Sequence, residues 1–184
     1  EGERLPYIGV GKLPGSILLG TFSKTVTPGM RTGFIISENR ELLKYISVAK
    51  EAGDLHTNIF SQYVIWDYIK NHDLDQHIAK IRTLYRQQAQ AMMDAMEQYF
   101  PPEVKYTRPE GGMFLWATLP EGVSAMSLFP KALEKKVAFV PGDPFYTDMK
   151  NLRTMRLNYT NADCETIREG IRRLGGLLEE LIER

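Results

Sequence analysis

The sequence predicts an α/β protein in two parts, and three observations support this. Two short apolar runs flank a polar connection near the start, which is typical of strands buried on both faces of a sheet. Three segments with helical spacing of apolar residues follow. From Val104 onward the apolar residues alternate with a period of two, which indicates strands, and a closing helix completes a mixed α+β unit.

Length and composition fit a globular protein without excess charge. The 184 residues suffice for one large or two small domains, with 43% hydrophobic and 25% charged residues. Lysine and arginine number 23, as do aspartate and glutamate, so net charge favours neither nucleic acid nor an anionic membrane as a partner. The single cysteine, Cys164, excludes an internal disulfide and fits a reducing, cytoplasmic compartment. No apolar run approaches the ~20 residues of a membrane-spanning helix, and no signal peptide is visible.

The first two strands and their connection, residues 16–36, form the segment around which the chain is organised. The connection carries Lys24 and Arg31 together with hydroxyl side chains such as Thr21 and Ser23. Arginine offers a planar pair of donors to a phosphate, and hydroxyls can complete such a site. A lysine at the end of a buried strand, near another cation, is expected to be partly desolvated. Both effects lower its pKa and favour the neutral amine that attacks a carbonyl. A solvated turn is the alternative interpretation of the same residues.

Helical spacing predicts three helices after the second strand, at residues 38–52, 59–70 and 73–99. The last is long enough to bridge two lobes, and we place the domain boundary at its start, which gives domains 1–72 and 73–184. Two fully buried strands cannot form a stable sheet alone, because their faces and edges need partners. Further strands are therefore expected from another chain or from a preceding segment.

The second part begins with two strands separated by Gly111-Gly112. A helix, two strands and a closing helix follow, at residues 127–136, 137–141, 154–159 and 163–182. In the strand at 154–159 the apolar residues share one face, while Arg156 and Asn158 lie on the other.

The string SKTVTPGMRTGF, residues 23–34, resembles the cofactor-lysine segment of class I/II aminotransferases, which are pyridoxal-phosphate enzymes of fold type I. In that family the lysine carries the cofactor, and an arginine seven residues later binds its phosphate. Lys24 and Arg31 have this spacing. The resemblance implies that Lys24 is the catalytic base and cofactor lysine, and that Arg31, helped by Thr21 or Ser23, holds the phosphate.

Further segments extend the resemblance over nearly the whole chain. HTNIFSQ (56–62) has its counterpart after the lysine segment of the family. PEGGMFLW (109–116) and PGDPFY (141–146) resemble motifs of the aminoadipate and kynurenine aminotransferase branch. LRTMRLNYTN (152–161) resembles the final strand, whose arginine binds the α-carboxylate of the substrate.

The last of these segments implies a substrate-binding role for Arg156. A bidentate pair with the carboxylate would orient the Cα–H bond of the substrate. Arg153 competes for this role, and an arginine facing solvent is the other interpretation of Arg156. For Phe145 and Tyr146, loop packing and a place in a pocket wall are about equally supported.

The resemblance covers the C-terminal half of a complete family member. That half consists of the end of the large-domain sheet and the α+β small C-terminal domain. A complete member has an N-terminal part with a glycine-rich phosphate loop, an aromatic residue stacked on the pyridine and an aspartate beneath the ring nitrogen. None of these has a match in this sequence. The chain alone is therefore expected not to carry out transamination.

The function implied is that of a pyridoxal-phosphate-dependent aminotransferase. It would exchange an amino group between an α-amino acid, aromatic or 2-aminoadipate-like, and a 2-oxo acid. The resemblance also implies a cytoplasmic homodimer in amino acid metabolism, with no metal, and with neither membrane nor nucleic acid bound through this segment. Two alternatives share the fold: the effector domain of a winged-helix transcription regulator, and a pyridoxal-phosphate lyase or decarboxylase. An arginine that retains the carboxylate disfavours the decarboxylase.

Overall fold

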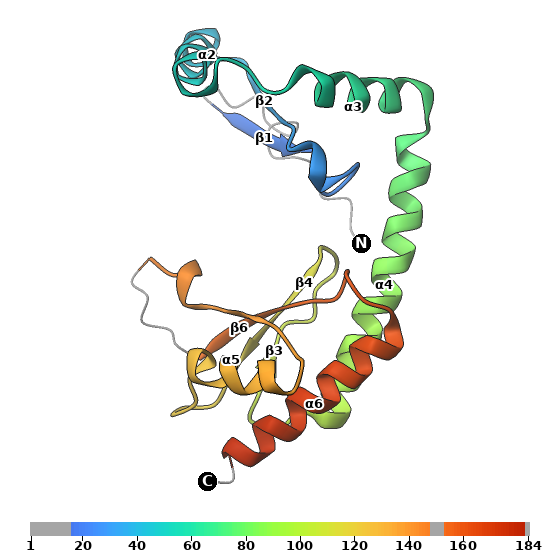
Figure 1. The fold of residues 1–184 in the computed structure, drawn as a ribbon, viewed down its shortest axis with the longest axis vertical. Helices are drawn as coiled ribbons and strands as arrows, with labels where there is room; N and C mark the ends of the chain where they lie inside the picture. Colours follow the sequence, from blue (N-terminus) through green and yellow to red (C-terminus); the bar gives the residue numbers. More distant parts are fainter. Residues whose placement is uncertain (1–15, 148–152, 183–184) are drawn as a thin grey trace. The chain divides into compact units, whose positions relative to one another are not determined.

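The computed structural model of the chain describes residues 16–147 and 153–182 (Figure 1). The chain divides into two compact units, one up to Ala79 and one from Lys80 onward. The division falls inside the long helix α4 (Leu74–Tyr99). The predicted domain boundary between residues 72 and 73 stays a prediction, and each unit is described by itself below.

The first unit contains an antiparallel pair of strands and two helices. Strand β1 (Ile17–Thr21) pairs with β2 (Gly33–Ser37), and a short 3-10 turn, η1 (Pro28–Met30), lies in their connection. Helices α2 (Arg40–Asp54) and α3 (Ile59–Asn71) follow. Each begins at an asparagine whose side-chain oxygen accepts a hydrogen bond from the first helical turn.

The predicted burial of the first two strands on both faces is wrong for the unit as described. Leu19 in β1 is 72% exposed and Ile36 in β2 is 51% exposed. The physical reason is that a strand pair needs a layer packed against each face to bury its side chains, and the described residues of this unit leave most of these side chains exposed. The apolar composition of these strands therefore indicates a sheet that needs further strands and covering layers.

The second unit is built on a four-stranded antiparallel sheet in the order β3-β4-β6-β5. Its strands are β3 (Lys105–Tyr106), β4 (Phe114–Thr118), β5 (Val140–Pro141) and β6 (Thr154–Asn158), with the 3-10 turn η2 (Asp143–Phe145) after β5. Its helices are the second part of α4, α5 (Ala125–Glu134) and α6 (Cys164–Ile182), with α4 and α6 lying side by side in Figure 1. The strand predicted at 137–141 is thus confined to its last two residues.

The register of β4 and β6 gives the sheet one core face and one open face. Leu115 lies opposite Leu157 and Ala117 lies opposite Met155, and all four side chains are buried in the core that the helices complete. The pair between them, Trp116 and Arg156, projects from the other face because successive side chains in a strand alternate. This alternation presents Arg156 on the side of the sheet away from the core.

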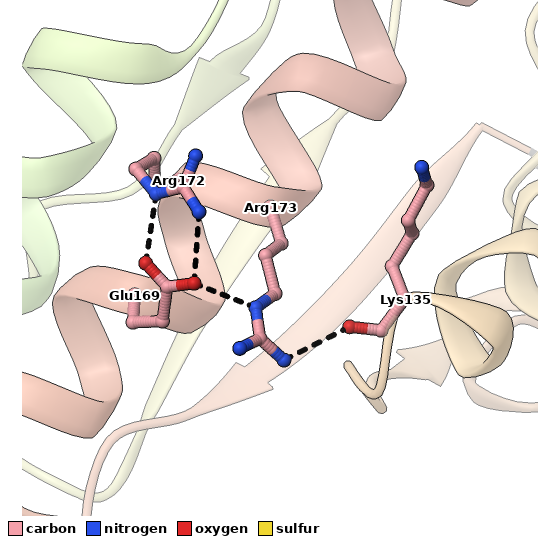
Figure 2. A network of polar contacts seen from close by, with 4 residues as sticks. All are labelled: Lys135, Glu169, Arg172 and Arg173. Atoms are coloured by element: carbon pink, nitrogen blue, oxygen red, sulfur yellow. Dashed lines mark hydrogen bonds and ion pairs between the residues drawn. The ribbon is translucent and has the colours of Figure 1, made fainter.

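Helix α6 is fixed to its neighbours by a close backbone approach and a polar network. A Cβ built on Gly175 would lie 2.2 Å from the carbonyl oxygen of Tyr99, so glycine permits this approach to α4. Glu169 accepts hydrogen bonds from Arg172 and Arg173, and Arg173 also donates to the carbonyl oxygen of Lys135 at 3.3 Å (Figure 2). The hydrogen bonds from Arg172 and then Arg173 lower the pKa of Glu169 from 4.5 to about 2.

Candidate active site

The connection between β1 and β2 is closed by its own backbone hydrogen bonds. The amide of Phe22 donates to the carbonyl oxygen of Thr32 at 3.1 Å, which continues the strand pair by one step. The carbonyl oxygen of Phe22 accepts from the amides of Val26 and Thr27 at 2.8 and 3.1 Å. These bonds fold residues 22–27 into a turn, and Lys24 lies exposed within it.

Two hydroxyl residues precede this lysine at the strand end. Thr21 is the last residue of β1, and its Oγ1 accepts a hydrogen bond from the amide of Ser23 at 3.1 Å. The bond sets the direction in which the chain leaves the strand. It places both hydroxyl residues on the same connection as Lys24.

Arg31 closes the connection in an unusual backbone conformation. Its φ of 50° and ψ of 39° are left-handed, a region that costs a side-chain-bearing residue about 1–3 kcal/mol and is enriched at functional sites. A terminal nitrogen of its guanidinium donates to the carbonyl oxygen of Pro28 at 3.2 Å. Among the described residues no carboxylate pairs with Arg31, so the guanidinium keeps donors for an anion.

Thr21, Ser23, Lys24 and Arg31 thus lie at the end of β1 and on the connection that follows it, and their joint role in binding a cofactor stays a prediction. The expected desolvation of Lys24 is wrong for the unit as described, because the side chain is exposed. The described residues place no layer over this turn, just as they place none over the strands. Any covering of Lys24 has to come from residues outside the described parts of this unit.

Arg156 occupies a second cluster, on the open face of the sheet in the other unit. Its guanidinium carbon lies 4.1 Å from the ring centre of Phe114 and 4.7 Å from that of Phe145. Its Nε is buried without a hydrogen-bond partner. The ring of Trp116 contacts Phe145 edge-on at 5.5 Å between ring centres and Tyr146 at 6.2 Å. Two aromatic rings therefore lie against this arginine, and Trp116 and Tyr146 extend the aromatic cluster beside Phe145.

Sequence reasoning missed the role of Phe114 in this cluster. It treated Phe114 only as part of a strand motif, and it left Phe145 and Tyr146 open between packing and a pocket wall. The signal available was the period of two in β4, which puts Phe114 and Trp116 on the face opposite to the buried Leu115. The spacing of apolar residues could not show that η2 lies over that same face.

The competing arginine, Arg153, has a different environment. Its nearer terminal nitrogen lies 3.9 Å from a carboxylate oxygen of Glu121, in a pair whose acidic partner is 95% exposed. Exposed pairs of this kind contribute little to stability. Arg156 has no carboxylate partner among the described residues, and its role as the ligand of a substrate carboxylate stays a prediction.

Two kinds of feature are absent from the described part of the chain. No group of three or more histidine, cysteine, aspartate or glutamate side chains is placed there to hold a metal ion. No helix within residues 16–147 and 153–182 combines the length and apolar character needed to cross a membrane.

Known proteins resemble the chain over nearly all of its length. It is 47% identical to aromatic-amino-acid aminotransferase 1 of Thermococcus litoralis over 170 residues, which is 91% of this chain and 40% of that protein. It is 44% identical to 2-aminoadipate transaminase of Thermus thermophilus over 169 residues, which is 92% of this chain and 42% of that protein. An HTH-type transcriptional regulator of Bacillus subtilis matches at the lower identity of 27%, over 91% of this chain and 34% of its own length. No family model matches the chain.

A solved structure extends the similarity to the fold. LysN, the α-aminoadipate aminotransferase of Thermus thermophilus, complexed with N-(5'-phosphopyridoxyl)-L-leucine, superimposes with a TM-score of 0.90 at 43% identity. The superposition covers 96% of this chain and 45% of LysN, so the chain spans less than half the length of these relatives. The fold and the identity together show that the chain belongs to the aminotransferases of fold type I and corresponds to their C-terminal half.

Proposed function

We propose that the complete protein is a pyridoxal-phosphate-dependent aminotransferase that exchanges an amino group between an α-amino acid and a 2-oxo acid. The observation that carries the proposal is the gathering of Lys24, Arg31, Thr21 and Ser23 on the connection of β1 and β2. The relatives at 44–47% identity are aminotransferases, and LysN holds a phosphopyridoxyl group.

The residues on this connection fit the cofactor chemically. An exposed primary amine can react with an aldehyde, and a guanidinium with free donors, on a connection that also carries hydroxyl side chains, suits a phosphate. The left-handed backbone of Arg31 holds the guanidinium against Pro28 on the same connection as the amine. Pyridoxal phosphate supplies an electron-withdrawing ring that stabilises negative charge on the α carbon of the substrate.

The side chains of this chain then have distinct tasks. Lys24 would hold the cofactor through its Nζ, and the same Nζ, once an amino acid has taken its place, would accept the proton from the α carbon of the substrate. Arg31, with Ser23 and Thr21, keeps the phosphate bound while that covalent link exchanges. Arg156 binds the α-carboxylate of the substrate through a bidentate pair and so orients the Cα–H bond.

We further propose aromatic or 2-aminoadipate-like amino acids as the substrates, by similarity to the two curated relatives. The aromatic rings around Arg156 provide apolar surface beside the proposed carboxylate site, which favours a substrate with a sizeable side chain. A cytoplasmic homodimer completes the proposal. The exposed apolar side chains of β1 and β2 call for a covering partner, which either the rest of the complete protein or a second copy would supply.

The two alternative functions are weaker. A regulator effector domain corresponds to the match at 27% identity, whereas the aminotransferases match at 44–47%. A lyase would use the same Lys24 and Arg156, and no relative described above is a lyase.

The experiment is a transamination assay on the purified full-length protein. It is incubated with pyridoxal phosphate, 2-aminoadipate or phenylalanine, and 2-oxoglutarate, and the formation of glutamate and of the new 2-oxo acid is measured. We expect both products in equal amounts. A lyase would form neither product from these substrates but would release pyruvate, ammonia and a thiol from an S-alkylcysteine, whereas tight cofactor binding without turnover of any of these substrates would indicate the regulator.

A further inference from the structure

We propose that Phe114 and Phe145 are positioning residues that hold the guanidinium of Arg156 between their rings. They fix the orientation in which Arg156 meets the carboxylate of a substrate. The inference rests on the proposed function of Arg156 and gives Phe114 and Phe145 a task beyond the apolar surface that they add beside it. We call the arrangement of Phe114, Arg156 and Phe145 the arginine clamp.

The clamp joins two elements that are distant in the sequence. Phe114 is the first residue of β4, and Phe145 is the last residue of η2. Their ring centres lie 4.1 and 4.7 Å from the guanidinium carbon of Arg156. A cation over the face of an aromatic ring is attracted by the ring electrons, so each ring restrains the guanidinium plane.

No polar contact within the described residues competes with the rings. The Nε atom of Arg156 is buried and has no hydrogen-bond partner, and no carboxylate of the described residues pairs with this side chain. The neighbouring arginines differ: Arg108 pairs with Glu97, and Arg153 lies 3.9 Å from Glu121. A long side chain without an ion pair samples many rotamers, so the rings supply the restraint that an ion pair supplies elsewhere.

Two contacts hold Phe145, one of the two rings of the clamp, in place. Trp116 lies opposite Arg156 in the β4–β6 ladder and contacts Phe145 edge-on, at 5.5 Å between ring centres. The amide of Phe145 donates to the carbonyl oxygen of Gly142 at 3.0 Å, which fixes the backbone of η2. The ring positions are therefore set by strand register and by a hydrogen-bonded turn.

Removal of one ring should loosen Arg156 without touching the chemistry at Lys24. In the full-length enzyme, Phe145→Leu is expected to raise KM for amino acids by about three- to tenfold, with kcat unchanged within about twofold. Because Arg156 binds the carboxylate common to all amino acids, the increase should be equal for alanine and for phenylalanine. Phe145→Tyr keeps the ring face and should restore KM to within about twofold of the wild type.

A double-mutant cycle identifies Arg156 as the intermediary. In an Arg156→Ala background, Phe145→Leu should change KM by less than about twofold, because the group that it positions is gone. Phe129→Leu is the matched control, since Phe129 packs against Phe139 in the same unit and is not one of the two rings over Arg156. It should leave KM unchanged even where it lowers thermal stability.

A spectroscopic measurement tests the clamp without turnover. Ring currents should shift the Nε–H signal of Arg156 upfield in the NMR spectrum of the full-length protein, and Phe145→Leu should remove much of that shift. Calorimetry with 2-oxoglutarate should show the same three- to tenfold loss of affinity in Phe145→Leu. Both measurements therefore test the positioning of Arg156 even if the wild type fails to transaminate.

Several results would overturn the clamp. A KM increase confined to phenylalanine would make Phe145 a contact for the substrate side chain. Equal effects of Phe145→Tyr and Phe145→Leu, an additive effect in the Arg156→Ala background, or an unshifted Nε–H signal would each contradict positioning by the rings.

Discussion

Trp116 and Arg156 lie directly opposite each other in the antiparallel ladder of β4 and β6, on the face of the sheet that carries no core. Their neighbours on both strands, Leu115 and Leu157, point the other way and are buried. Side chains alternate between the two faces of the sheet along each strand. The alternation that buries Leu115 and Leu157 in the core therefore also places Arg156 on the opposite face, beside the aromatic rings.

This placement predicts a loss of substrate binding when Arg156 is removed. In the full-length enzyme, Arg156→Ala should raise KM for amino acids by about ten- to a hundredfold, because a charge-assisted pair to the carboxylate is lost. The affinity for pyridoxal phosphate should stay the same. Steady-state kinetics and cofactor titration measure the two quantities.

Arg153→Ala is the control for that variant, since Arg153 pairs only weakly with the exposed Glu121. It should change KM by less than about twofold. A larger effect from Arg153→Ala than from Arg156→Ala would exchange the roles of the two arginines.

A pair of glycines in α6 predicts opposite effects on stability. Gly175→Ala would place its Cβ 2.2 Å from the carbonyl oxygen of Tyr99, so it should lower the free energy of unfolding by about 1–3 kcal/mol. Gly176→Ala meets open space and should raise it by about 0.5–1 kcal/mol, because alanine favours the helix. Urea denaturation of both variants tests the contrast, and equal effects would disprove the close contact of α6 with α4.

The network around Glu169 predicts a pH-dependent contribution to stability. Its folded-state pKa is lowered from 4.5 to about 2 by the hydrogen bonds from Arg172 and Arg173. The contribution is therefore fully present above pH 4.5 and is lost as the pH falls towards 2. Relative to the wild type, Glu169→Gln should lower the melting temperature at about pH 6, and the difference should shrink at about pH 3. A melting-temperature difference that grows as the pH falls would contradict the stabilising role assigned to the ionised Glu169.

Local features of the site were predictable from the sequence, whereas its surroundings were not. The connection that carries Lys24 and Arg31 is continuous in the chain, so its local turn and hydrogen bonds do not depend on tertiary packing. The helix predicted at 59–70 appears as Ile59–Asn71, because its caps and apolar spacing are also local.

Burial and long-range contacts depend on other elements. The side chains of Ile36 and Lys24 are exposed because the described part of the first unit offers no covering layer, which the apolar pattern alone cannot reveal. The contact of Phe145 with Arg156 depends on how η2 folds over the sheet, and spacing carries no signal for it.

The most direct test of the central claim is to locate the cofactor on the chain. The full-length protein is loaded with pyridoxal phosphate, reduced with borohydride, digested and mapped by mass spectrometry. The account predicts a phosphopyridoxyl group on Lys24 and none in the Lys24→Ala variant. Lys50, which forms an ion pair with Asp54 at 2.7 Å, serves as an internal control and should stay unmodified. A phosphopyridoxyl group on Lys12 or Lys50, with Lys24 unmodified in the wild type, would contradict the assignment of the active site.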